Sequence, residues 1–167
     1  MKYGTLYSYW SHEWVCDYPA VAKKVRAAGC DILEVGAPHI AAMTDAQLAE
    51  LKAAAEDNGL ILTTNIGPSK DQDLASPDPA IRKNGLDFLT GVLRAMDKIG
   101  SKSLVGAMYS FWPCDFKYTD KEAAWDTSIA EMKKLAAVAE DLGIDLCQEV
   151  LNRFETYIMT NAAEGVE

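Results

Sequence analysis

Two carboxylates with catalytic potential, Glu149 and Glu155, stand at the ends of the segment EVLNRFE, residues 149–155. The apolar residues just before this segment have the character of a short strand, which we place at 144–150. A carboxylate at the end of such a strand can ligate a divalent metal ion or transfer a proton. A structural ion pair with an arginine or lysine is the other role that this position allows for Glu149.

Side-chain alternation gives Glu149 a direction. Successive side chains of a strand point to opposite faces of the sheet. Ile144, Leu146 and Val150 share one parity, which suits a face that is covered by helices. Glu149 has the other parity, so we expect it to project inward, away from the helices.

Other polar residues have weaker claims to chemistry. Glu155 lies beyond the strand, and its position alone favours a solvent-exposed loop carboxylate. Arg153 could neutralise either glutamate, and Asn152 could cap a turn. Glu34 has inward parity near the end of the second expected strand, where we expect a structural ion pair.

Aromatic residues gather in the expected loops. Trp10, Trp14 and Trp112 all follow strands, and their rings can either wall a sugar or pack the loops onto the domain. The only histidines are His12 and His39, and neither has the spacing of a metal-binding motif. We expect both histidines to be solvated.

The elements that would carry these residues alternate between strand and helix. A Thr44–Gln47 capping box opens one of the helices. Polar and aromatic loops are expected at 67–79 and 110–118, and another helix begins near residue 161. The expected strands cover 3–9, 31–35, 60–65, 103–108 and 144–150, and the expected helices cover 17–28, 44–58, a stretch ending at Gly100, and 121–142.

Strand–helix alternation predicts a parallel sheet with right-handed crossovers, in the α/β class. A doubly wound sheet would need a glycine-rich phosphate loop after the first strand, but residues 7–14 contain no glycine. A TIM (β/α)8 barrel instead predicts functional residues after several strand ends, which fits the sequence. A complete barrel needs about 250 residues. We therefore interpret residues 1–167 as a single domain, the N-terminal part of a barrel with about five βα units.

Composition and charge restrict the function further. The net charge of −9 argues against nucleic-acid surfaces and anionic membranes, which both attract clustered lysine and arginine. No apolar run approaches the length of a membrane span, and no signal-peptide core is present. The four cysteines lack C-x-x-C spacing, so we expect reduced thiols in a cytoplasmic protein.

Several of these motifs together resemble those of one family. The chain is similar to the ketose 3-epimerases, the D-tagatose and D-psicose (D-allulose) 3-epimerase group of the xylose isomerase-like barrel superfamily. The resemblance covers all 167 residues in order. The segments that carry it are YSYW at 7–10 with EW at 13–14, IGPS at 66–69, GA at 106–107, FWP at 111–113 and EVLNRFE at 149–155.

The resemblance implies a metal-dependent isomerase that inverts C3 of a free ketose, such as D-fructose to D-psicose or D-tagatose to D-sorbose, through a cis-enediolate. It implies manganese or cobalt, with magnesium as a further option. Glu149 matches a glutamate that is both metal ligand and acid/base. Glu155 matches a substrate-binding glutamate near O1 and O2. The expected wall around the rest of the sugar is formed by Ala107, Trp112 and Trp14.

Two residues depart from the family pattern. Leu6 stands where the family often has a tyrosine, and Asn65 replaces a small residue, so we expect altered contacts around C4 to C6 of the sugar. The family's other metal ligands and its second glutamate would lie after residue 167. The full-length form is expected to be a homo-oligomer, either a dimer or a tetramer. The alternatives are another barrel enzyme of the superfamily, such as an aldose–ketose isomerase or a metal-dependent hydrolase, or an inactive fragment.

Overall fold

The computed structural model describes residues 1–114 and 120–166. Strands and helices alternate along the chain, as the sequence predicts. The strands are β1 (Gly4–Leu6), β2 (Ile32–Gly36), β3 (Ile61–Ile66), β4 (Ser103–Gly106) and β5 (Asp145–Gln148). The helices are α1 (Tyr18–Ala27), α2 (Ala37–Ala41), α3 (Asp45–Asp57), α4 (Pro79–Ile99), α5 (Lys121–Leu142) and α6 (Ala162–Val166), with short 3-10 helices at Tyr7–Tyr9 and Lys70–Gln72.

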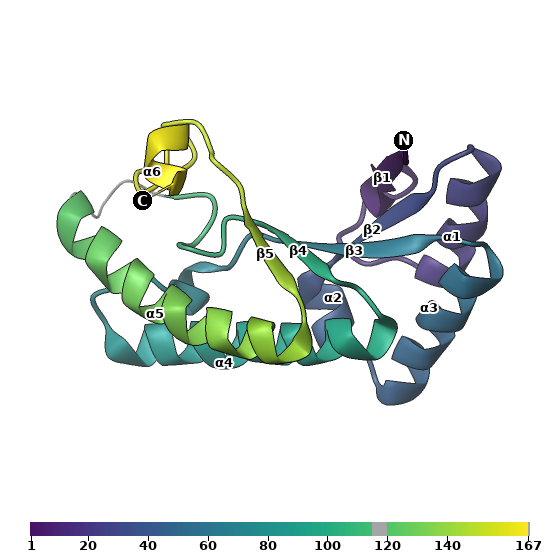
Figure 1. The fold of residues 1–167 in the computed structure, drawn as a ribbon, viewed down its shortest axis with the longest axis horizontal. Coiled ribbons are helices and arrows are strands. Elements are labelled where there is room, and N and C mark those ends of the chain that lie inside the picture. Colours follow the sequence, from purple (N-terminus) through teal and green to yellow (C-terminus); the bar gives the residue numbers. More distant parts are fainter. Residues whose placement is uncertain (115–119, 167) are drawn as a thin grey trace.

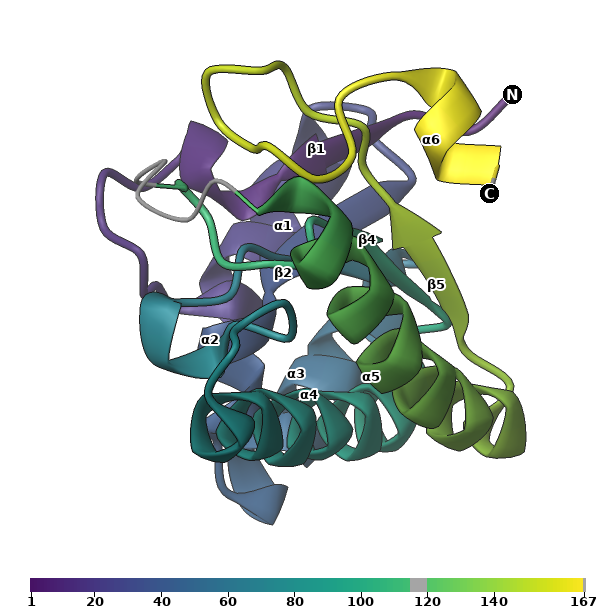
Figure 2. The same ribbon diagram turned by 90° about the vertical axis from the view of Figure 1, so that its left-hand side faces the viewer.

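The five strands form one parallel sheet in the order β1-β2-β3-β4-β5. The layer of helices α1–α5 covers one face of this sheet, while α6 lies apart, near the start of α5 (Figures 1 and 2). The carboxyl ends of parallel strands meet at one edge, so the loops that follow the strands gather there. The other face of the sheet corresponds to the inside of a barrel, and no described helix covers it.

The main core lies between the sheet and the helices. The alternate strand residues Leu33, Val35, Leu62 and Leu104 are buried there against helix residues such as Leu93. A second, smaller core lies beneath the loops at the strand ends. It contains Ala75, Ala107, Tyr109, Ala124, Ile158 and Met159.

Helix boundaries follow the predicted capping chemistry. The Thr44 hydroxyl accepts from the Gln47 N–H at 3.4 Å, and the Gln47 side chain accepts from the Thr44 N–H at 2.9 Å, which confirms the capping box. Asp17 and Asp120 cap α1 and α5 by accepting from N–H groups of the first turn. The long α5 has the predicted bounds.

Several local predictions were wrong: β4 ends at Gly106 and not at 108, and β5 ends at Gln148 and not at 150. The first strand ends at Leu6, because Tyr7 turns into a 3-10 helix in which its carbonyl accepts from the Trp10 N–H at 3.1 Å. That turn buries the Tyr7 ring edge-on against Tyr18, with ring centroids 5.4 Å apart. The short helix α2 was not expected, because five residues are too few for helical periodicity to be recognised. The loop expected at 110–118 lies partly outside the described residues.

Candidate active site

Glu149 follows directly on β5, and both of its backbone polar groups are fixed. Its N–H donates to the Gly106 carbonyl at 3.0 Å, which extends the pairing with β4. Its carbonyl accepts from the Tyr109 hydroxyl, also at 3.0 Å. The position of the Glu149 Cα is therefore set by β4 and by the loop that follows β4.

Side chains alternate along β5 as the sequence predicts, but Val150, which was expected to face the helices, lies beyond the strand and is 42% exposed. Leu146 packs against the main core, and the Gln148 amide lies 3.9 Å from the Met132 sulfur on α5. These even-numbered residues face the helices, so Glu149 faces the open side of the sheet. The side chain is exposed and has no hydrogen bond to any residue within 1–114 or 120–166. It is available to a ligand at the carboxyl-terminal edge of the sheet, which we call the mouth together with the loops that follow β3, β4 and β5.

Tyr109 is a supporting residue that the sequence did not reveal. Its ring is buried in the second core, and the Ser128 hydroxyl donates to its carbonyl at 2.6 Å. Burial, together with the nearby charge of Glu149, raises the pKa of Tyr109 to about 12. The phenol therefore stays protonated at neutral pH and remains a hydrogen-bond donor to the Glu149 carbonyl.

Glu155 is not the free, exposed loop carboxylate that its position favours. The Trp112 indole N–H donates to Glu155 Oε1 at 3.3 Å, and the Asn152 amide donates to Oε2. Asn152 also caps the local turn, as predicted, by accepting from the Phe154 N–H at 2.9 Å. Arg153 lies over the Phe154 ring at 5.3 Å, and in the described part of the chain it pairs with neither glutamate.

Trp112 is held against the loop that follows β3. Its backbone N–H donates to the Pro68 carbonyl at 2.9 Å. A Cβ at Gly67 would come within 3.0 Å of the Trp112 ring, so the absence of a side chain there lets the indole pack closely. Gly106, with φ of 136°, lets β4 approach β3, because a Cβ there would collide with the Ile66 carbonyl. Both glycines thus belong to the construction of the mouth.

The other expected wall residues differ in their surroundings. Trp14 is 79% exposed, and its carbonyl accepts from the Tyr7 hydroxyl at 3.1 Å. Leu6 is 38% exposed at the end of β1, level with Glu34 in the strand register. Ala107 is buried in the second core. The structure joins Trp112 with Glu155, and within the described residues no hydrogen bond or ring contact links these two to Trp14. The sugar-binding roles stay predictions.

The expectation of an ion pair for Glu34 was wrong within the described residues. Its carboxylate instead accepts from the Asn65 amide at 3.1 Å and from the Thr63 hydroxyl at 3.4 Å. These neighbours lie on the same face of β3, so neutral donors take the place that a cation was expected to fill.

One histidine also differs from expectation. His12 is exposed, but His39 is half-buried in α2 against the Tyr18 ring, with centroids 4.6 Å apart. Its buried Nδ1 has no hydrogen-bond partner in the described part of the structure, and burial lowers the pKa of His39. The His39 imidazole is therefore packed against Tyr18 and not solvated.

The described residues do not by themselves make a metal site. They contain no group of three or more histidine, cysteine, aspartate or glutamate side chains arranged around one point. Glu149 can supply one oxygen ligand, whereas divalent metals in proteins take several. Among residues 1–114 and 120–166, Glu149 is therefore a candidate for one ligand of a metal centre whose other ligands these residues do not supply.

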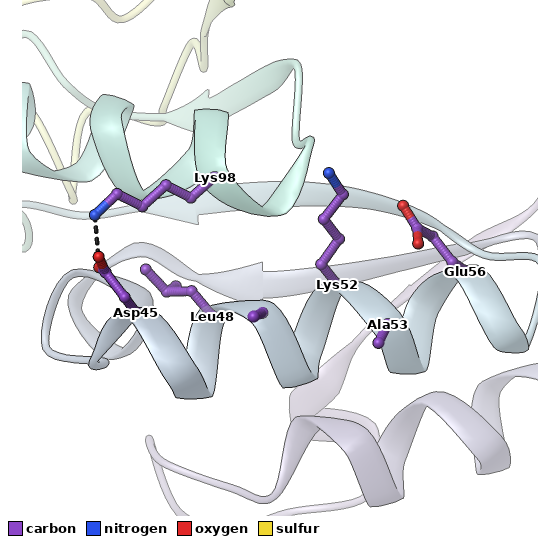
Figure 3. A pocket seen from close by; sticks show the side chains of 7 residues that line it. Asp45, Leu48, Lys52, Ala53, Glu56 and Lys98 are labelled. Atoms are coloured by element: carbon purple, nitrogen blue, oxygen red, sulfur yellow. Dashed lines mark hydrogen bonds and ion pairs between the residues drawn. The ribbon is translucent and has the colours of Figure 1, made fainter.

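Two hollows on the described surface are lined by other residues than those of the candidate site. One, of about 360 Å³, is lined by α3 residues and by Lys98 of α4. Figure 3 shows Asp45 and Lys98 pointing toward one another, and their charged groups are 2.6 Å apart. A second hollow, of about 480 Å³, lies beside β5 and the end of α5. Neither is lined by a residue that we assign to the site, so the site rests on the strand ends.

A parallel sheet covered by helices on one face, with a carboxylate and aromatic residues at its carboxyl-terminal edge, is the arrangement of part of a TIM barrel. Residues 22–167 match the family described as "Xylose isomerase-like TIM barrel". This match spans most of the chain, so the chain belongs to that family, and its fold is a partial barrel.

Within this family the chain is similar to sugar epimerases. It is 46% identical to the D-psicose 3-epimerase of Ruminiclostridium cellulolyticum and 44% identical to that of Agrobacterium fabrum. These alignments cover 100% and 99% of the chain, and 57% and 58% of the relatives. A crystal structure of the D-psicose 3-epimerase from Clostridium cellulolyticum H10 with D-tagatose superimposes with a TM-score of 0.96, at 46% identity, over 99% of this chain and 58% of that one.

The resemblance to ketose 3-epimerases is thus confirmed. The chain spans a little over half the length of these relatives. Within residues 1–114 and 120–166, no helix has both the length and the apolar character that crossing a membrane requires.

Proposed function

We propose that the whole protein to which this chain belongs is an isomerase that inverts C3 of a free ketose, interconverting D-fructose and D-psicose or D-tagatose and D-sorbose. One observation carries the proposal. Glu149 presents an exposed carboxylate, not engaged by any of the described residues, at the end of β5, on a backbone fixed from both sides, in a chain 46% identical to a D-psicose 3-epimerase.

Glu149 suits the proton transfer that this reaction needs. The proton on C3 of a ketose is acidified by the adjacent C2 carbonyl, so a carboxylate beside C3 can remove it and leave a cis-enediolate. Return of a proton to the opposite face inverts the centre. The second face needs another acid/base group, which we place outside the described residues.

Trp112 and Glu155 suit sugar binding. The apolar face of an indole stacks on C–H groups, and a carboxylate accepts hydrogen bonds from hydroxyls. Glu155 is already oriented by Trp112 and Asn152, and we propose that it accepts from the hydroxyls near C1 and C2. Trp14, Ala107 and Leu6 are proposed to border the rest of the sugar.

We further propose a divalent metal, manganese or cobalt with magnesium as a further option, with Glu149 as one of several ligands. When bound, such an ion stabilises negative charge next to a carbonyl oxygen. The other ligands would come from outside these residues. The cytoplasmic location and the dimeric or tetrameric state also stay predictions.

The test is the Glu149→Gln variant of the whole protein. Because glutamine cannot accept the C3 proton, turnover of D-fructose to D-psicose is expected to fall by about 100- to 10,000-fold. Glu56→Gln, an exposed change on α3, is the matched control and should keep normal turnover. Normal turnover of Glu149→Gln would show that the assigned role is wrong.

Reaction in D₂O separates the proposal from its main alternative. Epimerisation at C3 by proton transfer places deuterium on C3 of the sugar. Aldose–ketose isomerisation places it on C1 or C2 when it runs by proton transfer, and places none when hydride shifts directly between C1 and C2. Proton NMR of the recovered sugars gives the position directly. Deuterium at C1 or C2 alone, or an aldose product without deuterium, would favour the aldose–ketose isomerase.

A further inference from the structure

Asp73 is a buried carboxylate that joins two loops of the mouth. It lies in the loop after β3 and is 3% exposed. Its Oδ1 accepts from the Ala75 N–H at 2.9 Å, within the same loop, and from the Phe111 N–H at 3.3 Å, in the loop after β4. One oxygen atom therefore holds the two loops together.

The second of these bonds acts next to Trp112. The Phe111 N–H bound by Asp73 belongs to the residue before Trp112. The backbone N–H of Trp112 donates in turn to the Pro68 carbonyl at 2.9 Å, and Gly67 leaves room for the Trp112 ring. Two successive N–H groups are thus fixed on the loop after β3. This fixation determines where the indole meets Glu155.

The loop after β3 is itself packed closely against α4. A Cβ at Gly85 would collide with the Gln72 carbonyl, directly before Asp73 in the chain. The Asn84 amide donates to the Asp71 carbonyl at 2.7 Å. Asp73 is therefore anchored to a long helix and can transmit that rigidity to the loop after β4.

Burial and one described cation act in opposite directions on the pKa of Asp73. Lys70, whose ammonium lies 5.9 Å from the centre of the Phe111 ring, is the one described cation that lowers the pKa of Asp73. Burial outweighs this attraction and the two hydrogen bonds, so the pKa of Asp73 is raised. Protonation converts two charge-assisted hydrogen bonds into weaker ones.

We propose that Asp73 is a positioning residue, whose carboxylate fixes the Trp112 indole against Glu155 and thereby sets the affinity of the mouth for its sugar. The part that concerns affinity rests on the proposed function. The part that concerns geometry does not, because it follows from contacts within the described residues.

The geometric part can be tested by NMR of the indole N–H groups in the whole protein labelled with ¹⁵N. Trp112→Phe identifies the Trp112 resonance by its loss. Asp73→Ala should shift or broaden that resonance and leave those of Trp10, Trp14 and Trp125 in place. Asp73→Asn keeps an oxygen acceptor of the same shape but loses the charge, so it should move the Trp112 resonance less than Asp73→Ala does, toward its position in the wild type at low pH, and leave the other indole resonances in place. An unmoved Trp112 resonance in Asp73→Ala would overturn the proposal.

A pH titration keeps the test valid if Asp73→Ala does not fold. As the pH falls through the raised pKa of Asp73, the Trp112 resonance of the wild type should move, and this step should be absent in Asp73→Asn. Glu155 is present in both proteins, so the difference between the two curves isolates Asp73. Identical curves would contradict the proposal.

Kinetics then tests the functional part. Asp73→Ala should raise KM for D-fructose on the order of tenfold, equivalent to about 1.4 kcal/mol, with kcat changed much less. Asp73→Asn, which keeps the acceptor without the charge, should raise KM less than Asp73→Ala does. If the resonance shifts but the wild type epimerises no ketose, the proposed function fails and the positioning role stands. A shifted resonance with an unchanged KM would limit Asp73 to a structural role.

Discussion

At the residue scale, the Trp112–Glu155 contact joins two loops that follow different strands. The indole donates to Oε1 at 3.3 Å, and Asn152 occupies Oε2, so the carboxylate is held from both sides. Trp112→Phe keeps the ring over Gly67 but removes the N–H donor. Loss of a hydrogen bond to a charged group costs about 1.5–3 kcal/mol, and less at this partly exposed site.

The worth of this contact can be measured by a double-mutant cycle. Trp112→Phe, Glu155→Gln and the double variant should give a coupling energy of about 1 kcal/mol in urea unfolding. Trp125→Phe, combined with the same Glu155→Gln change, is the control and should show additivity. A coupling energy near zero for Trp112 would mean that the two side chains do not support each other.

A second residue-scale prediction concerns Glu164 in α6. Its carboxylate lies 2.6 Å from the Lys121 ammonium and accepts from the Thr160 N–H. These contacts lower the pKa of Glu164 from the ordinary 4.5 to about 2. A lowered folded-state pKa means that the stabilisation is present above the ordinary pKa and is lost as the pH falls toward the folded value.

Glu164→Gln should therefore lower Tm at neutral pH, by an amount equivalent to about 1 kcal/mol or less. The difference from the wild type should shrink steadily between about pH 5 and pH 3. Asp87→Asn, which breaks the exposed pair with Lys83, is the matched control and should change Tm little at any pH. A Glu164→Gln deficit that stays constant with pH would contradict the assigned role of Lys121.

At the scale of elements, the approach of α4 to the loop after β3 depends on one glycine. Gly85 is buried, and a Cβ there would collide with the backbone oxygen of Gln72, which cannot rotate away. Gly91 lies farther along the same helix and is exposed, and a Cβ added there would meet no heavy atom within 4 Å. Alanine substitutions at the two positions therefore distinguish the effect of steric fit from the effect of helix propensity.

Gly85→Ala should lower the free energy of unfolding by about 1–3 kcal/mol, because the loop or the helix must shift. Gly91→Ala should raise it by about 0.5–1 kcal/mol, because alanine favours the helix. Urea unfolding of both variants measures the two changes in the free energy of unfolding, which should have opposite signs. Stabilisation by Gly85→Ala would show that the helix and loop do not pack this closely.

Local patterns predicted much of this architecture, because period-two alternation and capping boxes are read within a few residues. They were sufficient to predict the alternation of side chains along β5 and the bounds of α5. The bond from Phe111 to Asp73 joins residues 38 apart, and that from Tyr109 to Glu149 joins residues 40 apart. No local pattern encodes such pairings, so the supporting residues of the mouth became visible only in three dimensions.

At the scale of the whole molecule, the sheet is open. Within the described residues, β5 pairs only with β4, and β1 only with β2. Ile61 and Val150 are 41% and 42% exposed. The hollow of about 480 Å³ lies along the free side of β5 and α5. In a complete barrel, further βα units would cover these surfaces.

A polypeptide limited to these 167 residues should therefore self-associate, because an unpaired strand edge and exposed apolar surface favour contacts between copies. Sedimentation velocity at increasing concentration should show a rising mass. With added manganese, this polypeptide should show no epimerase activity, since Glu149 alone cannot hold a metal ion. Conversion of fructose to psicose by the polypeptide would refute that part.

A charged substitution tests whether the free edge is the surface responsible. Cys147→Lys places a cation on exposed β5, where lysine disfavours pairing between edges, and should reduce association. Ala49→Lys adds the same charge at an exposed position of α3, which is not an edge element of the sheet, and should leave association unchanged. If both variants reduce association equally, net charge is the cause. If neither does, a surface other than the β5 edge brings the copies together, because only an interface at that edge can distinguish the two lysines.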